Sequence, residues 1–297
     1  MRTLRTIAEL RAALAQPRRE GSRIGLVPTM GAFHEGHLSL MRRAREDNDV
    51  VVVSLFVNPT QFNEGSDLAE YPRDENRDAL LASDAGVDYL FAPGTEEIYP
   101  PGFSASVSRG AITEVLEGAQ RSRAHFEGVA TVVTKLFNMV TPHVAYFGQK
   151  DAQQARVIKQ LVRDLDMQVQ IEVCPIVREP DGLAMSSRNV RLSPTEREQA
   201  TALNRALRVA ADRVEGGESD SDAITAAART ELDTAKVSTE YFEIVDIETF
   251  APIATIDGPA LAVVAARVGS TRLIDNQQLS TKSAVGQYAG AVAAGSN

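Results

Sequence analysis

The alternation of strand-like and helix-like segments over residues 20–178 constrains the fold of this chain more than any other feature. Residues 24–27 are apolar, residues 38–44 carry apolar side chains at helical spacing, and residues 50–57 form a near-continuous apolar run. Strand, helix and strand thus follow one another within about 35 residues, the length of a βαβ unit. An apolar run such as 50–57 is typical of a parallel strand that is covered on both faces.

The same alternation continues toward residue 178. We expect helices at 6–14, 75–85, 129–140 and 152–165, strands at 87–92, 144–147 and 168–177, a turn at 18–21 and a loop at 93–103. Helices that alternate with strands in this way predict an α/β fold with a Rossmann-like, doubly wound parallel sheet.

The pattern changes after residue 178. Ser193-Pro194-Thr195-Glu196 is a capping box with proline at the first helical position, which predicts a helix that runs to about 214. A second helix is expected at 221–235, and strands at 241–247 and 260–268. We therefore expect a Rossmann-like catalytic domain over 1–180 and a smaller C-terminal α+β domain over 181–282, which is expected to act as a lid. The small, polar residues 283–297 are expected to be a disordered tail.

Charge and composition narrow the class of protein. The formal net charge is −9, which argues against a general binder of nucleic acid or of an anionic membrane. No stretch approaches the length of a membrane span, and the N-terminus lacks the apolar core of a signal peptide. Cys174 is the single cysteine, so an intramolecular disulfide is impossible, and its apolar surroundings favour a buried structural thiol. We expect a cytoplasmic protein.

The segment Pro28–His37 reads PTMGAFHEGH and connects a strand to a helix. A helix start offers unpaired N–H groups and the positive end of a dipole, so phosphate binds there readily. His34 and His37 are three residues apart and share one helix face, and the chain has only 4 histidines. A packed or capping histidine is the simpler interpretation of either one alone. Zinc is less favoured, because no third ligand is evident.

Two further segments have the side chains of a phosphate site. Gly148-Gln149-Lys150-Asp151 lies at a strand-to-helix junction, where lysine supplies a point charge. Met185-Ser186-Ser187-Arg188 is a polar stretch, expected to be flexible, with two hydroxyls and a guanidinium that can hold two oxygens at once. Taken alone, the first is more simply a turn with a solvated ion pair, and the second a polar linker between domains.

Amide side chains form the last constellation. Asn58 and Gln61 follow an apolar strand, and Gln154 lies four residues beyond Lys150, on what we expect to be the same helix face. Amides orient carboxylate and hydroxyl groups without adding charge, although surface amides are common. Each of these motifs falls at the carboxyl end of an expected strand or at the domain boundary, which makes coincidence a poor explanation for all of them.

Seven segments in order resemble the pantothenate synthetase (pantoate–β-alanine ligase) family, within the HxGH-type nucleotidyltransferase superfamily. They are PTMGAFHEGH, VNPTQF, YPRD, HFEGVATVV, YFGQKD, DGLAMSSRN and GSTRLIDN, and they span the chain to about residue 280. The resemblance implies a ligase of the coenzyme A pathway that forms an amide bond from pantoate and β-alanine. It implies ATP and Mg²⁺, a pantoyl-adenylate intermediate, release of AMP and pyrophosphate, and a homodimer.

The resemblance also implies roles for individual residues. His37 is the family's proton donor, although stabilisation of charge by both histidines is the physically safer role. The expected catalytic residues are His34, His37, Lys150, Ser186, Ser187 and Arg188. The expected ATP site comprises Met30, Gly31, Ala32, Phe33, His34, Glu35, Gly36, His37, Gly148, Gln149, Lys150, Asp151, Val177, Met185, Ser186, Ser187 and Arg188. Pantoate is expected at Gln61 and Gln154, with Val132 and Val133 as an apolar wall, and β-alanine at Gln61. The ligands of the metal are unknown.

Two departures from the family pattern stand out. Gln149 occupies a position where the family usually has Glu, so we assign it no catalytic or metal role within the ATP-binding segment. Residues 116–126 are one residue longer than the family pattern, and either Arg121 or Arg123 could match the family's arginine.

Three other functions remain open. Another small-molecule nucleotidyltransferase would share the histidines and the basic segments, but the pair Gln61 and Gln154 suits a small hydroxy acid. A relative of aminoacyl-tRNA synthetases would need an RNA-binding module, and the net charge of −9 does not suit one. A non-catalytic nucleotide-binding protein would bind ATP without turnover.

Overall fold

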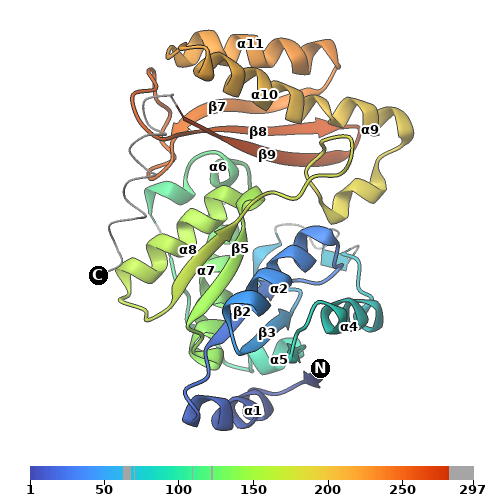
Figure 1. Cartoon of the computed structure of the whole chain (residues 1–297), viewed down its shortest axis with the longest axis vertical. Coiled ribbons are helices and arrows are strands. Elements are labelled where there is room, and N and C mark those ends of the chain that lie inside the picture. The colour runs from blue at the N-terminus through green and yellow to red at the C-terminus, as the bar shows by residue number, and fades with distance from the viewer. Residues whose placement is uncertain (63–67, 70, 109, 122, 281–297) are drawn as a thin grey trace. The chain divides into compact units, whose positions relative to one another are not determined.

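The computed structural model of the chain describes residues 1–62, 68–69, 71–108, 110–121 and 123–280, without the side chains at 111, 121 and 123. The chain divides into two compact units, Met1–Val177 and Arg178–Asn297 (Figure 1). Each unit has its own hydrophobic core, so each is described by itself.

A parallel sheet of six strands forms the centre of the first unit, with the order β1-β4-β3-β2-β5-β6. Its strands are β1 Arg2–Leu4, β2 Ile24–Thr29, β3 Val50–Leu55, β4 Tyr89–Phe91, β5 Val144–Gly148 and β6 Gln170–Cys174. The expected Rossmann-like, doubly wound sheet is confirmed.

Helices of the first unit connect these strands. They are α1 Ile7–Arg19, α2 Glu35–Asp47, α4 Glu75–Asp84, α5 Thr95–Ile98, α6 Glu117–Arg121, α7 Arg123–Val140 and α8 Ala152–Asp164. The short 3-10 helices are η1 Pro59–Gln61, η2 Ala111–Thr113 and η3 Gln149–Asp151.

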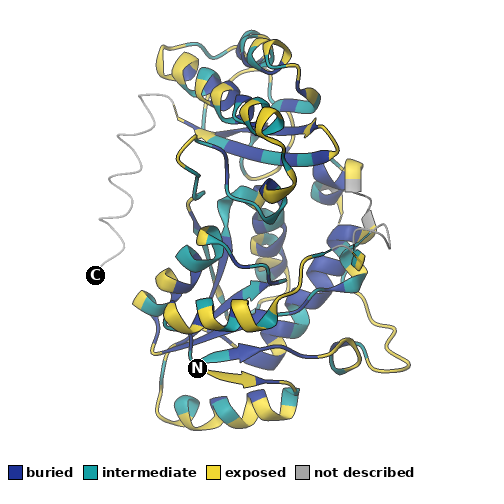
Figure 2. Cartoon of the chain, turned by 90° about the vertical axis from the view of Figure 1, so that its right-hand side faces the viewer, coloured by how far each residue is buried: buried dark blue, intermediate teal, exposed yellow. Residues whose placement is uncertain are grey.

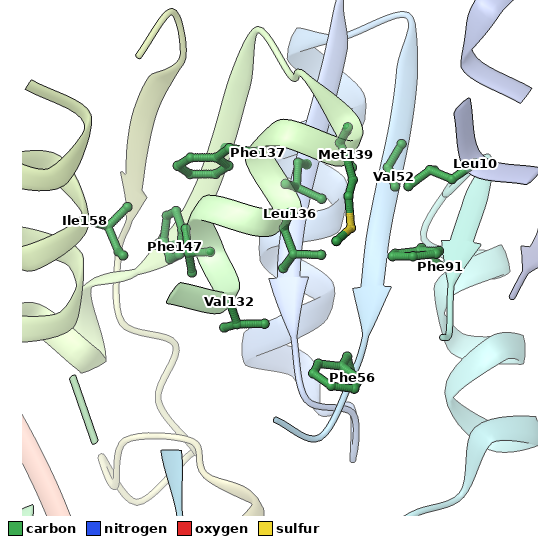
Figure 3. Close-up of a cluster of buried hydrophobic side chains, with 14 of the residues drawn as sticks. Leu10, Val52, Phe56, Phe91, Val132, Leu136, Phe137, Met139, Phe147 and Ile158 are labelled. Atoms are coloured by element: carbon green, nitrogen blue, oxygen red, sulfur yellow. The ribbon is translucent and has the colours of Figure 1, made fainter. Parts of the chain in front are cut away.

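Alternating side chains along each strand divide the core of this unit into two layers. Ile24, Leu26 and Val52 face α1, α7 and α8, whereas Val27 and Val53 face α2 and α4. Figure 3 shows the first layer, in which side chains of α7 lie against the sheet, with Leu10 of α1 and Ile158 of α8 at its two sides. Such two-sided burial explains why the strands read as continuous apolar runs rather than as alternating ones.

The order of the strands places a topological switch point between β2 and β5. The chain proceeds from β2 to β3 and β4 on one side, and from β5 to β6 on the other, while β2 and β5 pair directly through Gly25 and Val144. In open α/β sheets, ligands bind beyond the carboxyl ends of the strands at such a point. The two segments that leave these ends begin at Met30 and at Gln149.

The second unit packs helices on an antiparallel sheet of order β7-β8-β9. Its elements are η4 Ser187–Arg191, α9 Pro194–Ala200, α10 Ala202–Glu215, α11 Ser221–Thr234, β7 Ser238–Asp246, β8 Ala260–Val268 and β9 Thr271–Leu279. Apolar side chains of α10 and α11 share one core with Phe242, Ile244 and Val264 of the sheet. The expected smaller α+β domain is thus confirmed as a fold, while its role as a lid stays a prediction.

Several expected boundaries are wrong. The single helix expected from 193 to 214 is two helices, α9 and α10, which meet at Thr201. The helix α1 continues into the expected turn as far as Arg19, so only residues 20–21 of that turn remain, and the expected loop 93–103 contains α5. Neither β1 nor β9 was expected. The expected disordered tail lies outside the described residues.

Burial follows the layers of the two units (Figure 2), with buried strands and with exposed residues on the outer sides of the helices. Cys174 is buried, as expected, and burial raises the pKa of its thiol to about 11. None of the described helices is both long enough and apolar enough to cross a membrane.

Candidate active site

The turn between β2 and α2 places both histidines of the HxxH motif at the start of a helix. His34 is the N-cap of α2, with extended backbone, and its Nδ1 accepts the N–H of Gly36 at 3.2 Å. Nδ1 of His37 lies 3.4 Å from the N–H of His34, and the two rings are 4.2 Å apart between centroids. Because each Nδ1 accepts a backbone N–H, a neutral ring carries its proton on Nε2. Both imidazoles can therefore donate a hydrogen bond from Nε2.

The surroundings of His37 keep its ring neutral. Desolvation, together with the nearby charges of His34 and Lys150, lowers the pKa of His37 to about 3. Lys150 lies in η3, directly after β5. The charge of a residue that follows β5 thus acts on the pKa of a residue that follows β2, on the other side of the switch point. A neutral imidazole beside a lysine suits the binding of phosphate oxygens better than proton donation at neutral pH.

A network of amides holds Gln61 at the carboxyl end of β3. Asn58 is 1% exposed, and its Nδ2 donates to Oε1 of Gln61 at 3.1 Å and to the carbonyl of Gly128 at 3.2 Å. Gln61 in turn places its Nε2 3.0 Å from Sδ of Met30. His125 Nδ1 lies 2.7 Å from the Gln61 carbonyl oxygen. Residues that follow β2 and β3 are thus brought together, as the sequence predicts.

For several other expected site residues, the structure does not match the sequence-based expectation or does not test it. Lys150 belongs to η3 and Gln154 to α8. Contrary to the expectation, the two residues therefore do not share one continuous helix. Val132 and Val133 lie in the hydrophobic core, at 7% and 4% exposure. Their role as a wall for pantoate stays a prediction. Val177 follows β6 as the last residue of the first unit.

The remaining residues of the expected ATP segment 30–37 differ in their surroundings. Phe33 is 1% exposed and its ring lies 5.5 Å from that of His37, so it packs against His37. Glu35 is exposed and forms an ion pair with Arg42. Gly31 has a φ of 90° and Ala32 one of 54°, so the chain turns through the left-handed region before α2 begins.

The serine–arginine segment of the second unit is ordered by its own contacts. Ser186 is the N-cap of η4 and its Oγ accepts the N–H of Arg188 at 3.3 Å. Asn189 is 6% exposed and donates to Oε1 of Glu179 at 2.6 Å and to the Ala184 carbonyl at 3.1 Å. Residues 187–191 form the short helix η4, and the flexibility expected of residues 185–188 stays a prediction.

A cavity of about 310 Å³ opens beside the carboxyl ends of β2 and β3. Of the expected site residues in the described part of the chain, Met30 and Gly31 line it, and Phe56, Val57 and Asp78 contribute to its other walls. The cavity is therefore a neighbour of the HxxH turn.

Sequence reasoning missed residues that act through the backbone. Asp78 of α4 is 1% exposed and accepts N–H groups of the HxxH turn. Asp78 was expected only as part of the helix at 75–85, and charge alone gives no sign of a buried carboxylate. Asn58 was noted for its position but not placed in the site. The choice between Arg121 and Arg123 stays open, because their side chains fall outside the described part of the chain.

Comparison with known families and sequences shows what the chain is similar to. The family model described as pantoate-beta-alanine ligase matches residues 2–278. The chain is similar to the pantothenate synthetase of Roseiflexus castenholzii, with 53% identity over 93% of this chain and 98% of that protein. It is equally similar to the pantothenate synthetase of Thermotoga petrophila, with 53% identity over 93% of this chain and 99% of that protein.

Solved structures give the same result. The pantothenate synthetase of Thermus thermophilus matches with a TM-score of 0.89 and 48% identity, over 93% of this chain and 99% of that one. The pantoate-beta-alanine ligase of Francisella tularensis, complexed with beta-gamma ATP and beta-alanine, matches with a TM-score of 0.78 and 35% identity. That match covers 93% of this chain and 97% of the other.

Proposed function

The chain belongs to the pantoate–β-alanine ligase family, and from this membership we propose which of its residues carry the reaction. The protein is a ligase that condenses pantoate with β-alanine in an ATP-dependent reaction and forms an amide bond. In the mechanism that we propose, the pantoate carboxylate attacks the α-phosphorus of ATP and displaces pyrophosphate. The amine of β-alanine then attacks the acyl carbon of pantoyl adenylate, and AMP leaves.

The single observation that carries the residue-level proposal is the pairing of the His34 and His37 rings at the start of α2, where the ring centroids are 4.2 Å apart and each Nδ1 faces a backbone N–H. His34 and His37 donate hydrogen bonds from Nε2 to phosphate oxygens, and Lys150 adds a positive charge. These groups stabilise the charge that grows as the α-phosphorus is attacked. Because His37 is neutral well below pH 7, we assign it hydrogen-bond donation rather than proton transfer.

The acceptor side of the reaction is assigned to Gln61 and Gln154. The amide of Gln61 is held by Asn58 and Met30, so it can orient a carboxylate or hydroxyl of pantoate with little freedom to lose. We propose that Gln61 also faces β-alanine, and that Gln154 binds pantoate. Ser186, Ser187 and Arg188 are proposed to hold phosphate oxygens of ATP, and Met185 and the backbone at Val177 to line the ATP site.

Magnesium fits this site as a companion of ATP. Among the described residues there is no group of three or more His, Cys, Asp or Glu side chains that could hold a metal ion. Mg²⁺ is commonly bound through substrate phosphates, waters and one or two carboxylates, and the exposed Asp151 beside Lys150 offers one carboxylate. When bound, the ion would neutralise phosphate charge. A homodimer and a cytoplasmic location are further proposals, which rest on the family.

The first test is exchange of labelled pyrophosphate into ATP without β-alanine. We expect exchange that requires pantoate, since the acyl adenylate forms reversibly in the first half-reaction. Exchange with other hydroxy acids and not with pantoate would favour another small-molecule nucleotidyltransferase. ATP binding with no exchange for any acid would contradict the proposed mechanism and would favour a non-catalytic protein.

A further inference from the structure

A buried carboxylate on α4 holds the turn that leads to the HxxH motif. Asp78 is 1% exposed, and its two oxygens serve different donors. Oδ2 accepts the N–H of Ala32 at 2.7 Å, and Oδ1 accepts the N–H of Phe33 at 2.8 Å. These two donors are consecutive backbone groups, so the carboxylate fixes the orientation of the peptide between them.

The turn that Asp78 holds has a conformation that alanine seldom adopts. Ala32 has a φ of 54°, in the left-handed region, where Cβ crowds the backbone of an L-residue. Gly31 has a φ of 90°, and a Cβ at this position would lie 2.9 Å from Oδ2 of Asp78. Such a strained turn persists only when the surrounding structure imposes it.

The neighbouring Arg77 also contacts this turn, through an exposed side chain. Its Nη1 donates to the Phe33 carbonyl at 3.1 Å and lies 3.8 Å from Oδ1 of Asp78. Since the Arg77 side chain is 57% exposed, it stabilises the turn less than the buried Asp78 carboxylate does. Both residues belong to the first half of α4, which is distant in sequence from β2 and α2 (Figure 1).

The position of the turn determines where the two histidines lie. Phe33 is directly followed by His34, which caps α2, and the Phe33 ring packs 5.5 Å from the His37 ring. A shift of the 32–33 peptide would therefore move the cap of α2 and the packing against His37. Asp78 itself contacts the backbone of the turn, so its influence on the histidines passes through that peptide.

We propose that Asp78 is a positioning residue for adenylate formation, which acts by holding the Ala32–Phe33 peptide so that His34 and His37 face the phosphates. The inference rests on the proposed function of the two histidines. An isosteric D78N variant keeps the shape but offers only one acceptor oxygen, and its NH₂ group faces a backbone N–H. We expect the turn to shift in this variant while the fold is retained.

The kinetic test compares D78N with D84N, which removes a carboxylate from the exposed end of the same helix. We expect D78N to lower kcat for pantoate-dependent pyrophosphate exchange by about 10- to 100-fold, since small misplacements of catalytic groups have effects of this size. The KM for ATP should change less than kcat. D84N should match the wild type. A kcat for D78N within about twofold of the wild type would overturn the proposal.

Long-range ¹H–¹⁵N spectra of the histidines test the positioning directly. The Nδ1 and Nε2 signals of His34 and His37 should shift in D78N, while those of His143, whose Nδ1 accepts the N–H of Ile24 at 2.9 Å, should not. Unchanged His34 and His37 signals would overturn the proposal whatever the turnover. A wild type without pantoate-dependent exchange would instead contradict the proposed function, so the two failures are distinguishable.

The double variant A32G/D78N tests the cause and covers a D78N protein that does not fold. Glycine adopts a φ of about 54° without strain, so less restraint is needed to keep the turn. We expect A32G/D78N to recover part of the lost kcat, or to fold where D78N does not. If the double variant folds and is no more active than D78N, the turn is not the route by which Asp78 acts.

Discussion

At the scale of single residues, the site depends on backbone donors that determine which nitrogen of each imidazole carries the proton. His34 and His37 each direct Nδ1 toward a backbone N–H at the start of α2. This arrangement leaves Nε2 as the donor of both rings, and it uses the unpaired N–H groups of the helix start for orientation. The phosphate binding that we propose for the motif would therefore use side-chain N–H groups as much as the helix end.

The low pKa of His37 predicts a specific pH dependence. The folded ring stays neutral down to about pH 3, whereas the unfolded ring takes up a proton near pH 6.5. Between these values the unfolded state binds more protons, so this group makes stability fall as the pH falls. We expect the free energy of unfolding of the wild type to drop more steeply between about pH 7 and pH 5 than that of H37Q. Denaturant unfolding at both pH values measures this, and equal slopes would contradict the assignment.

The charge of Lys150 is predicted to act in the first half-reaction. K150A should lower the single-turnover rate of adenylate formation by about two decades, as the loss of a charge stabiliser often does. K159A is the matched control, because Lys159 is an exposed lysine of α8, one element further along the chain. Adenylation at the wild-type rate in K150A would contradict the role assigned to this lysine.

At the scale of elements, α7 and η1 are held together by a close approach of backbone. A Cβ added at Gly128 would lie 2.6 Å from the Thr60 carbonyl oxygen, and Asn58 donates to the Gly128 carbonyl. The glycine in the HFEGV segment is thus explained by the contact between α7 and the turn that carries Gln61. Gly128 lies within a helix, so the requirement is one of space rather than of backbone conformation.

G128A should therefore disturb the pantoate site more than the ATP site. The added methyl group pushes η1 away from α7, and Gln61 moves with η1. We expect the KM for pantoate to rise about tenfold or more, with a smaller change in the KM for ATP. G94A serves as the control, since a Cβ at Gly94 meets no atom within 4 Å. Steady-state kinetics of both variants decide the matter, and a selective rise in the KM for ATP would count against this account.

The elements that the sequence predicts well are those buried on both faces. β2, β3 and β5 are apolar on both sides, so their patterns are unambiguous. β9 was missed because Asp275 and Asn276, each 3% exposed, are polar residues at buried positions where apolar residues would be expected. Asp275 is accommodated there by Arg178, at 2.6 Å and 3.1 Å. That pairing joins residues far apart in sequence, and hydrophobic periodicity does not detect it.

The break between α9 and α10 was missed for a different physical reason. Thr201 keeps helical backbone angles, with φ −63° and ψ −17°, so the apolar spacing continues through it. In the candidate site, too, some residues could be found from the sequence and others could not. Motifs such as HxxH carry their chemistry in side chains and were found, whereas Asp78 acts on the backbone of a segment 46 residues away and was not.

At the scale of the whole molecule, the phosphate-binding side chains that we propose come from both units. Ser186 and Arg188 belong to the second unit, where Arg197 pairs with Glu179 and, at 2.7 Å, with Asp181. Asn189 adds hydrogen bonds to Glu179 and to the Ala184 carbonyl. These contacts thus hold the segment that carries Ser186 and Arg188 to the rest of its own unit. A lid built in this way would move as part of the unit rather than as a separate loop.

N189A tests whether this base orders the segment. Without the amide, residues 183–191 lose two hydrogen bonds, and we expect faster backbone hydrogen exchange there in the free protein and a KM for ATP raised about tenfold. In the wild type, ATP with pantoate should slow exchange in the same residues, as a closing lid requires. V190S changes the adjacent, 87% exposed side chain and should leave both measurements unaltered. If backbone hydrogen exchange in N189A equals that of the wild type, other contacts order the segment. If hydrogen exchange of the wild type is unaffected by ATP and pantoate, the proposed lid is contradicted.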